Sequence, residues 1–566
     1  MFSTLLGFVK NKIWLAVLLC IIPVAIYTWV FNAIALNVNY VAFDDILILG
    51  IIPEFDNASW PKRWQLLTTL FPEHRLIFSR SVILLIYDLF GHVNLVWLMI
   101  VSNICWGLCA VIFYKAFSKL RISFWYFVPV MWLWFHIQSF ENIFWGVSSL
   151  CNFGVILFSL LALYFTAFHP QKVILSLLFA VCATFTYGNG LMVLPVIGVI
   201  YLLSGHRKQF LATLIFTIVV AIIYFIDFHP ITQNLSFSDP QQVKEGFFGL
   251  FGFIGSIATL GAYRVPLQMM YVASAFGMFM VVLFIWLYSK QILPLWNAAL
   301  LKSRYDKPTA VFALSLIMFV GITTLALTYK RIPTDSFEGM FKGRYRMYSA
   351  MCCIALYFAF LSLKTQHSRL RLSPVILIIS ILLNFVILHA NVAEAVNFRR
   401  SAITQEFNAR YNTDWLGIRM FSMDQGHFEK IRAYYRSADP LAEGWKPAGN
   451  FDKTMCDSIM QPTSITTLGD FLMINFENDF FKAVKDYSDG AYVILKSDRH
   501  VYASPPNQSP VPLKTTLRRG MYFTKGVYAN FHRDTIEPGI YDIYLLYRQS
   551  GKNKIYCTGK TWSEAD

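Results

Sequence analysis

The chain of 566 residues is 56% hydrophobic and only 14% charged. Soluble globular proteins carry about 25% charged residues, so this composition excludes an ordinary soluble protein and indicates a polytopic membrane protein. The formal net charge of +15 does not indicate a nucleic-acid-binding protein, because the basic residues lie in short loops between apolar runs. That distribution is the one the positive-inside rule describes.

The apolar residues fall into runs of roughly 17 to 25 residues, the length that crosses a bilayer as a helix. They are rich in Leu, Ile, Val and Phe and lack the alternation of barrel strands, so we predict an all-α bundle of about 11 transmembrane helices. The expected crossings are 13–35, 93–113, 122–137, one ending at 169–172, one ending at 187–190, one ending at 205–208, 210–225, 267–288, 310–328, 348–363 and 374–389.

Two features at the start and in the middle of this series set the orientation. Lys10 and Lys12 precede the first run, which is longer than a signal-peptide core and should stay as an anchor with its basic end in the cytoplasm. The glycine-rich stretch 246–262 fits either a full crossing or a re-entrant helix. A full crossing would place the basic loops at 290–307 and 364–371 outside, so the charge pattern favours a re-entrant helix.

The first outer loop, residues 37–92, carries adjacent carboxylates at Asp44 and Asp45 beside an apolar run. A carboxylate at the membrane surface can act as a general base on an acceptor hydroxyl, which contributes about 10² to 10⁴ in rate. An Asp at a helix start can instead cap the helix. Trp60 and Trp64 suit a headgroup boundary, and 76–90 is expected to form an interfacial helix.

Two further polar groups lie on the same expected side. Glu73, His74 and Arg75 follow in the first loop, where a cation can hold a phosphate or simply belong to a solvated interface cluster. Glu141 and Asn142 lie among aromatic residues between the third and fourth expected crossings. They are candidates for substrate contact, and the alternative is an interhelical hydrogen bond.

The stretch 329–349 breaks the charge rule. The expected topology places it outside, yet it holds several cations: Lys330, Arg331, Lys342, Arg344 and Arg346. A cationic outer loop is explained if it neutralises an anionic ligand such as a phosphate, whose oxygens match the guanidinium fork. The alternative is that the local topology is inverted.

Residues 391–566 differ from the rest in composition, with more charged residues and turn signals, so we predict a separate extramembrane α/β or β-rich domain after the membrane domain 1–390. Residues 397–411 should be helical, and 491–497 and 539–548 alternate as strands do. Cys456 and Cys557 can pair if this domain faces an oxidising compartment. No metal-ligand spacing, P-loop, dinucleotide fingerprint or HExxH is present.

Several short motifs together resemble one family. They are the acidic pair after the first membrane helix, the Glu-His-Arg of the first loop, ENIFWG at 141–146, YGNG at 187–190, GRY at 343–345 and the outer C-terminal domain. This combination is similar to the GT-C class of integral membrane glycosyltransferases, and within it to bacterial O-antigen-modifying, serotype-converting glucosyltransferases.

The resemblance implies an inverting transfer of a sugar, glucose in those relatives, from a polyprenyl-phosphate donor to a lipid-linked glycan such as O-antigen of lipopolysaccharide. It implies the periplasmic face of a bacterial inner membrane, with the C-terminal domain periplasmic and no nucleic-acid partner. Asp44 and Asp45 match the catalytic position. The donor phosphate would be held by His74, Arg75, Lys342, Arg344 and Arg346, and the substrates by Glu73, Glu141, Asn142 and Tyr345.

Two questions stay open at this level. No clear DxD motif is present, so no metal ligand is assigned and a requirement for a divalent cation is left undecided. A polytopic transporter or flippase for a lipid-linked sugar would also have many helices and intramembrane charges. The gathering of charged residues at one surface, without an evident internal repeat, favours the enzyme.

Overall fold

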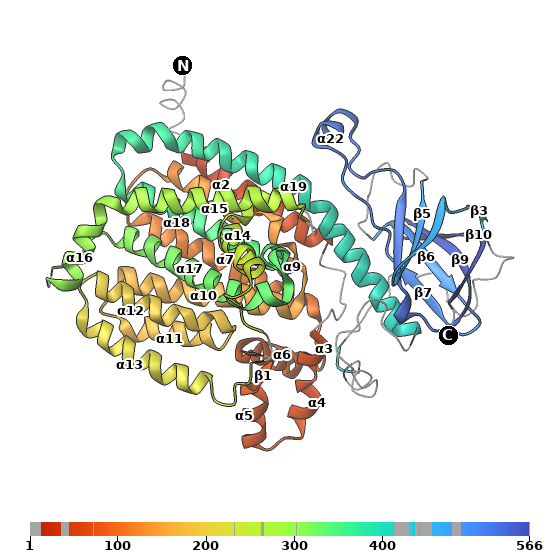
Figure 1. Ribbon diagram of the computed structural model, residues 1–566, viewed down its shortest axis with the longest axis horizontal. Helices are drawn as coiled ribbons and strands as arrows, with labels where there is room; N and C mark the ends of the chain where they lie inside the picture. The colour runs from red at the N-terminus through yellow and green to blue at the C-terminus, as the bar shows by residue number, and fades with distance from the viewer. Residues whose placement is uncertain are drawn as a thin grey trace.

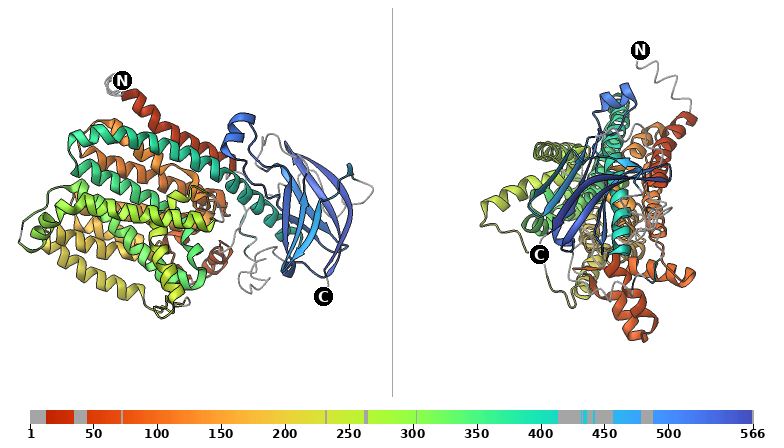
Figure 2. Two further views of the ribbon diagram at one scale, coloured as in Figure 1. Left: turned by 45° about the horizontal axis from the view of Figure 1, so that its top comes forward. Right: turned by 90° about the vertical axis from the view of Figure 1, so that its right-hand side faces the viewer.

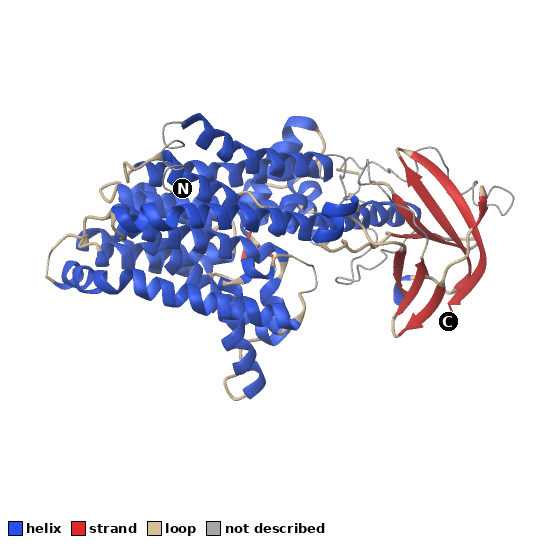
Figure 3. Ribbon diagram, turned by 90° about the horizontal axis from the view of Figure 1, so that it is seen from above, coloured by secondary structure: helices blue, strands red, loops and turns tan. Residues whose placement is uncertain are grey.

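The computed structural model describes residues 13–34, 45–71, 73–230, 233–261, 265–301, 303–412, 431, 433–435, 441, 456–477 and 488–564. These residues form a bundle of helices followed by a β-rich region that stands beyond one end of the bundle (Figures 1 and 3). The prediction of a mainly helical membrane protein with a β-rich C-terminal region is confirmed.

Eight helical stretches of the described residues are long and apolar enough to cross a membrane. They contain α2 (Ile13–Ile34), α7 (Leu95–Ser118), α10 (Gly146–Phe168), α13 (Arg207–Tyr224), α15 (Leu267–Tyr288), α17 (Pro308–Asp335), α18 (Arg346–Leu363) and α19 (Gln366–Tyr411). Each coincides with an expected crossing. The other three expected crossings coincide with shorter helices, α8 (Val128–Trp134), α11 (Val173–Thr184) and α12 (Val193–Leu203), so a count of 11 is reached only if these also cross.

The helices differ in how much of their surface the protein covers. α10 and α18 are mostly buried, and their residues belong to the main apolar core, whereas most residues of α13 and α15 are only partly covered or exposed. A helix that is apolar all round and exposed at the rim of a bundle requires an apolar solvent, which here is lipid.

The glycine-rich stretch forms α14 (Pro240–Ile254), which runs beside α15 in the same direction. Phe248 packs on Tyr271, and Gly255 lies so close to Gly277 that a side chain on either glycine would meet backbone atoms of the other helix. Because the two consecutive helices run in the same direction, the chain between them must turn back. This is the re-entrant arrangement that the charge pattern favours.

The first loop folds into short elements at the lower right of the bundle in Figure 1. They are α3 (Asp45–Leu49), α4 (Ile51–Asp56), α5 (Trp60–Thr68), the two-residue strands β1 (Leu70–Phe71) and β2 (His74–Arg75), and α6 (Ile77–Phe90). Trp60 and Trp64 are exposed on α5, as expected for residues at a headgroup boundary. The helix α6 coincides with the expected interfacial helix.

The opposite end of the bundle carries the basic loops. Arg207 donates to the carbonyls of Ala299 and Leu300 at the end of α16 (Ile292–Leu300), and Lys119 and Lys172 lie near His169. In the connecting segments 115–123, 169–172, 204–208, 289–307 and 364–371, Asp306 is the one acidic residue among many Lys and Arg. The two ends of the bundle therefore differ sharply in charge.

The helix α19 links the bundle to the C-terminal region without interruption. It has 46 residues, a length of about 69 Å, and it runs through the expected domain boundary at 390/391. Its last turns emerge from the bundle and pack against the β-rich region (Figures 1 and 2). Buried arginines fix this contact: Arg399 donates to Ser488, and Arg400 donates to the Asp489 carbonyl and to Gln508.

The described residues of the C-terminal region form two packed sheets. One has the strand order β3 (Ser458–Ile459), β10 (Lys552–Glu564), β9 (Gly539–Gln549), β6 (Gly490–Lys496) and β7 (Val501–Ser504), and the other has β4 (Ser464–Leu468), β5 (Phe471–Phe476) and β8 (Val527–His532). The two predicted strands correspond to β6 and β9. The strand β6 is buried on both faces, because one face meets the second sheet and the other meets α19.

Cys456 and Cys557 form a disulfide, with their Cα atoms 5.6 Å apart. The pairing of these two cysteines that the sequence allowed is thus present. The bond joins the segment that leads into β3 to the last strand, β10, and closes a loop of 101 residues.

Candidate functional site

Segments that are far apart in the sequence meet at the end of the bundle that carries the first loop, here called the site end. They are α3, β2, α9 (Phe140–Phe144), the 3-10 turn η3 (Gly188–Met192), the last turns of α17 and the 3-10 turn η7 (Gly343–Tyr345). The motifs ENIFWG, YGNG and GRY all belong to this set, so the sequence motifs converge on one place.

Asp45 is fixed at the start of α10. Its Oδ1 atom accepts hydrogen bonds from the indole Nε1 of Trp145 (3.0 Å) and from the backbone N of Val147 (3.2 Å), and the residue is 1% exposed. The N-terminus of a helix favours negative charge, so this carboxylate also serves as a cap for α10. Asp44 lies outside the described residues.

Trp145 connects Asp45 to a cation. The guanidinium carbon of Arg344 lies 6.0 Å from the centre of the Trp145 ring and 5.5 Å from that of Tyr345. Such contacts of a guanidinium with aromatic faces are favourable. The Trp145 side chain also packs with Ala402 and Ile403 of α19, so the C-terminal part of the chain supports the site.

The backbone of Arg344 is held on both sides by α9. Glu141 accepts a hydrogen bond from the Arg344 N (3.1 Å) through Oε2, and the Asn142 amide donates to the Arg344 carbonyl (2.8 Å). Asn152 in turn donates to the Asn142 Oδ1 atom (2.9 Å). A side chain on Gly343 would approach the Glu141 carboxyl carbon to 3.1 Å, which explains the glycine of the GRY motif.

More cations lie beside Arg344. Arg331 and Lys342 both contact the Asp335 carboxylate, at 3.5 and 2.7 Å. Arg331 and Arg344 both lie close enough to Tyr187 to interact with it electrostatically. Arg331, Lys342 and Arg344 are each half-buried. Two arginines and a lysine, partly neutralised by Asp335 and by Glu141 beside Arg344, leave a cationic site, which suits a phosphate.

His74 lies on the same side of the site. Its ring packs on Tyr187 with centroids 4.3 Å apart, and a side chain on Gly188 would come within 2.5 Å of the His74 Nδ1 atom. Burial and the Arg331 cation, opposed by Glu73, together lower the pKa of His74 to about 4. The imidazole is therefore neutral at neutral pH and adds no cation to the site.

This depressed pKa predicts that acid destabilises the protein through His74. Below pH 6.5 the unfolded chain binds a proton at this residue while the folded chain does not, so stability falls between about pH 6.5 and 4, by up to about 3 kcal/mol. Thermal unfolding of the detergent-solubilised chain across this range should show a flatter pH dependence for His74→Gln. The control is His229→Gln, because His229 is exposed. Equal pH slopes in all three proteins would contradict the prediction.

In three of the predicted site residues, the side chain donates hydrogen bonds to backbone carbonyls. Arg75 is buried and donates to the carbonyls of Tyr224, Thr68 and Ile226, so it joins the first loop to the end of α13. Arg346 is 1% exposed and donates to the Phe341 carbonyl. Asn142 is fully buried and acts on the backbone of Arg344. These residues position the site rather than line it.

The other predicted residues that the structure describes lie at the site. Glu73 is half-buried, with its carbonyl accepting a bond from the Tyr224 hydroxyl, and Tyr345 packs against Arg344. Trp145, Tyr187 and Arg331 were not among the predicted site residues. Trp145 and Tyr187 belong to the ENIFWG and YGNG motifs, and Arg331 to the basic stretch, so the signals that could have found them were present.

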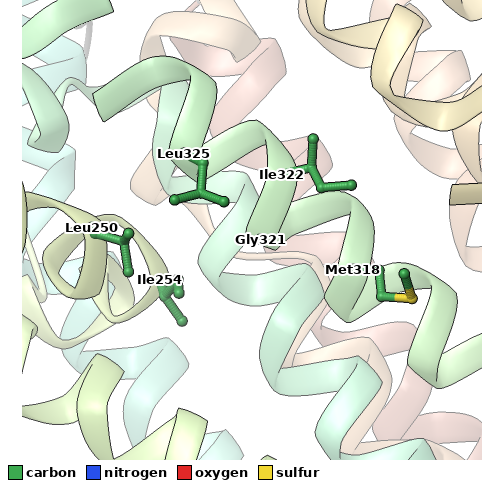
Figure 4. A pocket seen from close by; sticks show the side chains of 6 residues that line it. All are labelled: Leu250, Ile254, Met318, Gly321, Ile322 and Leu325. Atoms are coloured by element: carbon green, nitrogen blue, oxygen red, sulfur yellow. The ribbon is translucent and has the colours of Figure 1, made fainter. Parts of the chain in front are cut away.

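Among the described residues, no group of three or more His, Cys, Asp or Glu side chains is arranged to hold a metal ion. An apolar pocket of about 310 Å³ lies between α14 and α17, lined by Leu250, Ile254, Met318, Gly321, Ile322 and Leu325 (Figure 4). Arg331 follows Ile322 by nine residues, about two and a half turns, and so lies on the other side of α17. The pocket is therefore separate from the cationic site.

Comparison of the chain with family models, with curated proteins and with solved structures finds no match.

Proposed function

We propose that the protein is an inverting membrane glycosyltransferase that moves a sugar, glucose by the resemblance, from a polyprenyl-phosphate donor to a lipid-linked glycan such as O-antigen. The observation that carries this proposal is the connected set Asp45, Trp145 and Arg344 at one end of the bundle. This set connects two segments. The acidic one can supply a base, and the cationic one can hold a leaving phosphate.

The chemistry needs these two parts. In a single displacement, a carboxylate takes the proton of the acceptor hydroxyl as that hydroxyl attacks the anomeric carbon, and the bond to the phosphate breaks on the opposite face. The departing phosphate gains negative charge, which fixed cations stabilise in the transition state. Arg344, Arg331 and Lys342 supply the cations, and Asp44 or Asp45 supplies the base.

The burial of Asp45 divides the roles of the two carboxylates. Asp45 is held by Trp145 and by the start of α10, which suits a carboxylate that fixes the geometry of its segment. Its neighbour Asp44 is then the candidate for direct contact with the acceptor, while Glu141 fixes Arg344 through the backbone. Separate substitutions of the two aspartates distinguish these roles.

We further propose that the site end faces the periplasm of a bacterial inner membrane, with about 11 crossings when α8, α11 and α12 are included. The charge difference between the two ends supports this orientation, because Lys and Arg are enriched in cytoplasmic loops. The Cys456–Cys557 disulfide supports it as well, since such bonds persist in oxidising compartments.

The orientation predicts a specific pattern of thiol labelling. Chain isolated from cells, unfolded in detergent and treated with a maleimide polymer should take up seven labels before reduction, on the free cysteines, and nine after it. A Cys557→Ser variant should take up eight in both conditions. Nine labels without prior reduction would contradict an oxidising location for this region.

The activity is tested with the purified full-length chain. Incubation with a radiolabelled polyprenyl-phosphate sugar and a lipid-linked O-antigen precursor should transfer the label to the glycan. If the chain were a flippase for the lipid-linked sugar instead, reconstituted vesicles would move the labelled lipid between leaflets without transferring the sugar. That outcome would overturn the enzyme proposal.

A further inference from the structure

A short basic hairpin of the C-terminal region lies beside the bundle. Residues 509–526 form a hairpin between the strands β7 and β8, with α22 (Leu513–Arg519) at its tip. Val511 donates to the Tyr522 carbonyl (2.7 Å) and Thr524 to the Ser509 carbonyl (2.9 Å), so the two arms of this hairpin are paired and its tip is held at a fixed place. Figures 1 and 2 show α22 at the rim of the bundle end rather than over its middle.

The hairpin is anchored on α19 at one level. The Thr516 hydroxyl is hydrogen-bonded to the His389 Nε2 atom (3.0 Å), and the Tyr522 hydroxyl donates to the His389 carbonyl (2.6 Å) and accepts from the Ala393 N (2.9 Å). These contacts come from both the tip and the arm of the hairpin. They fix its height along α19.

This position along α19 corresponds to the edge of the hydrocarbon core of the membrane. One side of α19 exposes a stripe of apolar side chains: Val375, Ile378, Ile379, Leu382 and Phe385. His389 follows Phe385 by four residues, about 6 Å along the helix on the same face. The headgroup layer on each side of a bilayer is several ångströms thick, so α22 lies at the depth of the lipid headgroups.

The surface of α22 is amphipathic and basic. No residue of this helix is buried, and Leu517 is 78% exposed, with Leu513 one turn before it on the same face. A helix of seven residues is not stable alone in water, so a covering surface is to be expected. Lys514, Arg518, Arg519 and Lys525 are all exposed, and the sequence contains no acidic residue between Asp498 and Asp534.

We propose that the 509–526 hairpin binds the anionic phospholipid surface of the membrane that the bundle spans. Leu513 and Leu517 enter the boundary of the acyl chains, and the four cations contact headgroup phosphates. Because α19 joins the bundle to the sheets and the hairpin is bonded to α19, this contact would fix the C-terminal region over the membrane surface.

The experiment measures the depth of a label on the full-length chain in lipid nanodiscs. A Leu517→Cys variant carries an environment-sensitive fluorophore, and quenching by headgroup spin-labelled phosphatidylcholine is recorded after subtraction of the unsubstituted chain, which accounts for the free cysteines. The controls are Leu468→Cys and Ile540→Cys, because these residues are exposed to a similar degree, 71% and 72%, on β4 and β9. We expect several-fold stronger quenching at position 517 than at either control.

The contribution of charge is tested by combining Lys514→Gln, Arg518→Gln and Arg519→Gln. In nanodiscs that contain phosphatidylglycerol, this change should lower the quenching at position 517 to the level seen with phosphatidylcholine alone. Equal quenching at 517, 468 and 540 would overturn the proposal. So would a fluorophore at 517 that is shielded from water but not quenched by lipid, since a protein or glycan would then cover α22.

Discussion

The Asp44→Asn variant is expected to lower sugar transfer by about 10²- to 10⁴-fold, the usual contribution of a general base. The Asp45→Asn variant is expected to lower the rate through the loss of positioning. Asparagine keeps an oxygen that accepts from the Trp145 indole, so Asp45→Asn should fold. It loses the interaction of a negative charge with the start of α10, worth about 1 kcal/mol. Initial rates of label transfer and the unfolding temperature are measured together.

The two variants separate catalysis from positioning. If Asp44 is the base and Asp45 holds the segment, Asp44→Asn removes the pH dependence of the rate, while Asp45→Asn lowers the rate without changing its pH profile. The matched control is Glu54→Gln, an exposed carboxylate of α4 on the same loop, which should transfer sugar at the unsubstituted rate. Full activity in both aspartate variants would remove the first loop from the catalytic assignment.

The long helices could be predicted because a span needs a run of apolar residues, and α2 and α7 supply one without interruption. The short helices could not be bounded in this way. The helix α11 has 12 residues, because the chain turns at Phe185 and the YGNG segment forms a 3-10 turn. The continuity of α19 across the predicted boundary at 390/391 was not predicted, because the apolar run 374–389 and the polar helix 397–411 were treated as two elements. No Gly or Pro stops the helix between them, so its apolar half continues into the polar half that packs on the sheets.

The candidate site could be predicted in its charges and not in its contacts. Asp45 and Arg344 stood out because charged residues at the edge of a membrane need a reason. The role of Trp145 between them depends on the approach of three distant segments, which composition does not encode. Arg75 looked like a phosphate ligand beside His74, but two of the three carbonyls that accept from it lie about 150 residues away, at the end of α13.

The Arg344→Gln variant is expected to lower kcat/KM for the polyprenyl-phosphate sugar by about 10²- to 10³-fold, since it removes a fixed cation where the leaving phosphate gains charge. Arg344→Lys should recover part of this loss, because it keeps the charge but not the planar fork that matches phosphate oxygens. The fold should persist in both variants, because the hydrogen bonds of Glu141 and Asn142 go to the backbone of residue 344 and remain in both.

The comparison with Arg331→Gln decides whether the two arginines act on the same phosphate. Both lie near Tyr187, so if they hold one phosphate the double variant should lose less activity than the product of the two single losses. The matched control is Lys244→Gln, an exposed cation on α14, which should leave kcat/KM unchanged. If Arg344→Gln and Lys244→Gln gave the same kcat/KM, the cationic site would have no part in binding the donor, and the phosphate would have to be sought elsewhere on the site end.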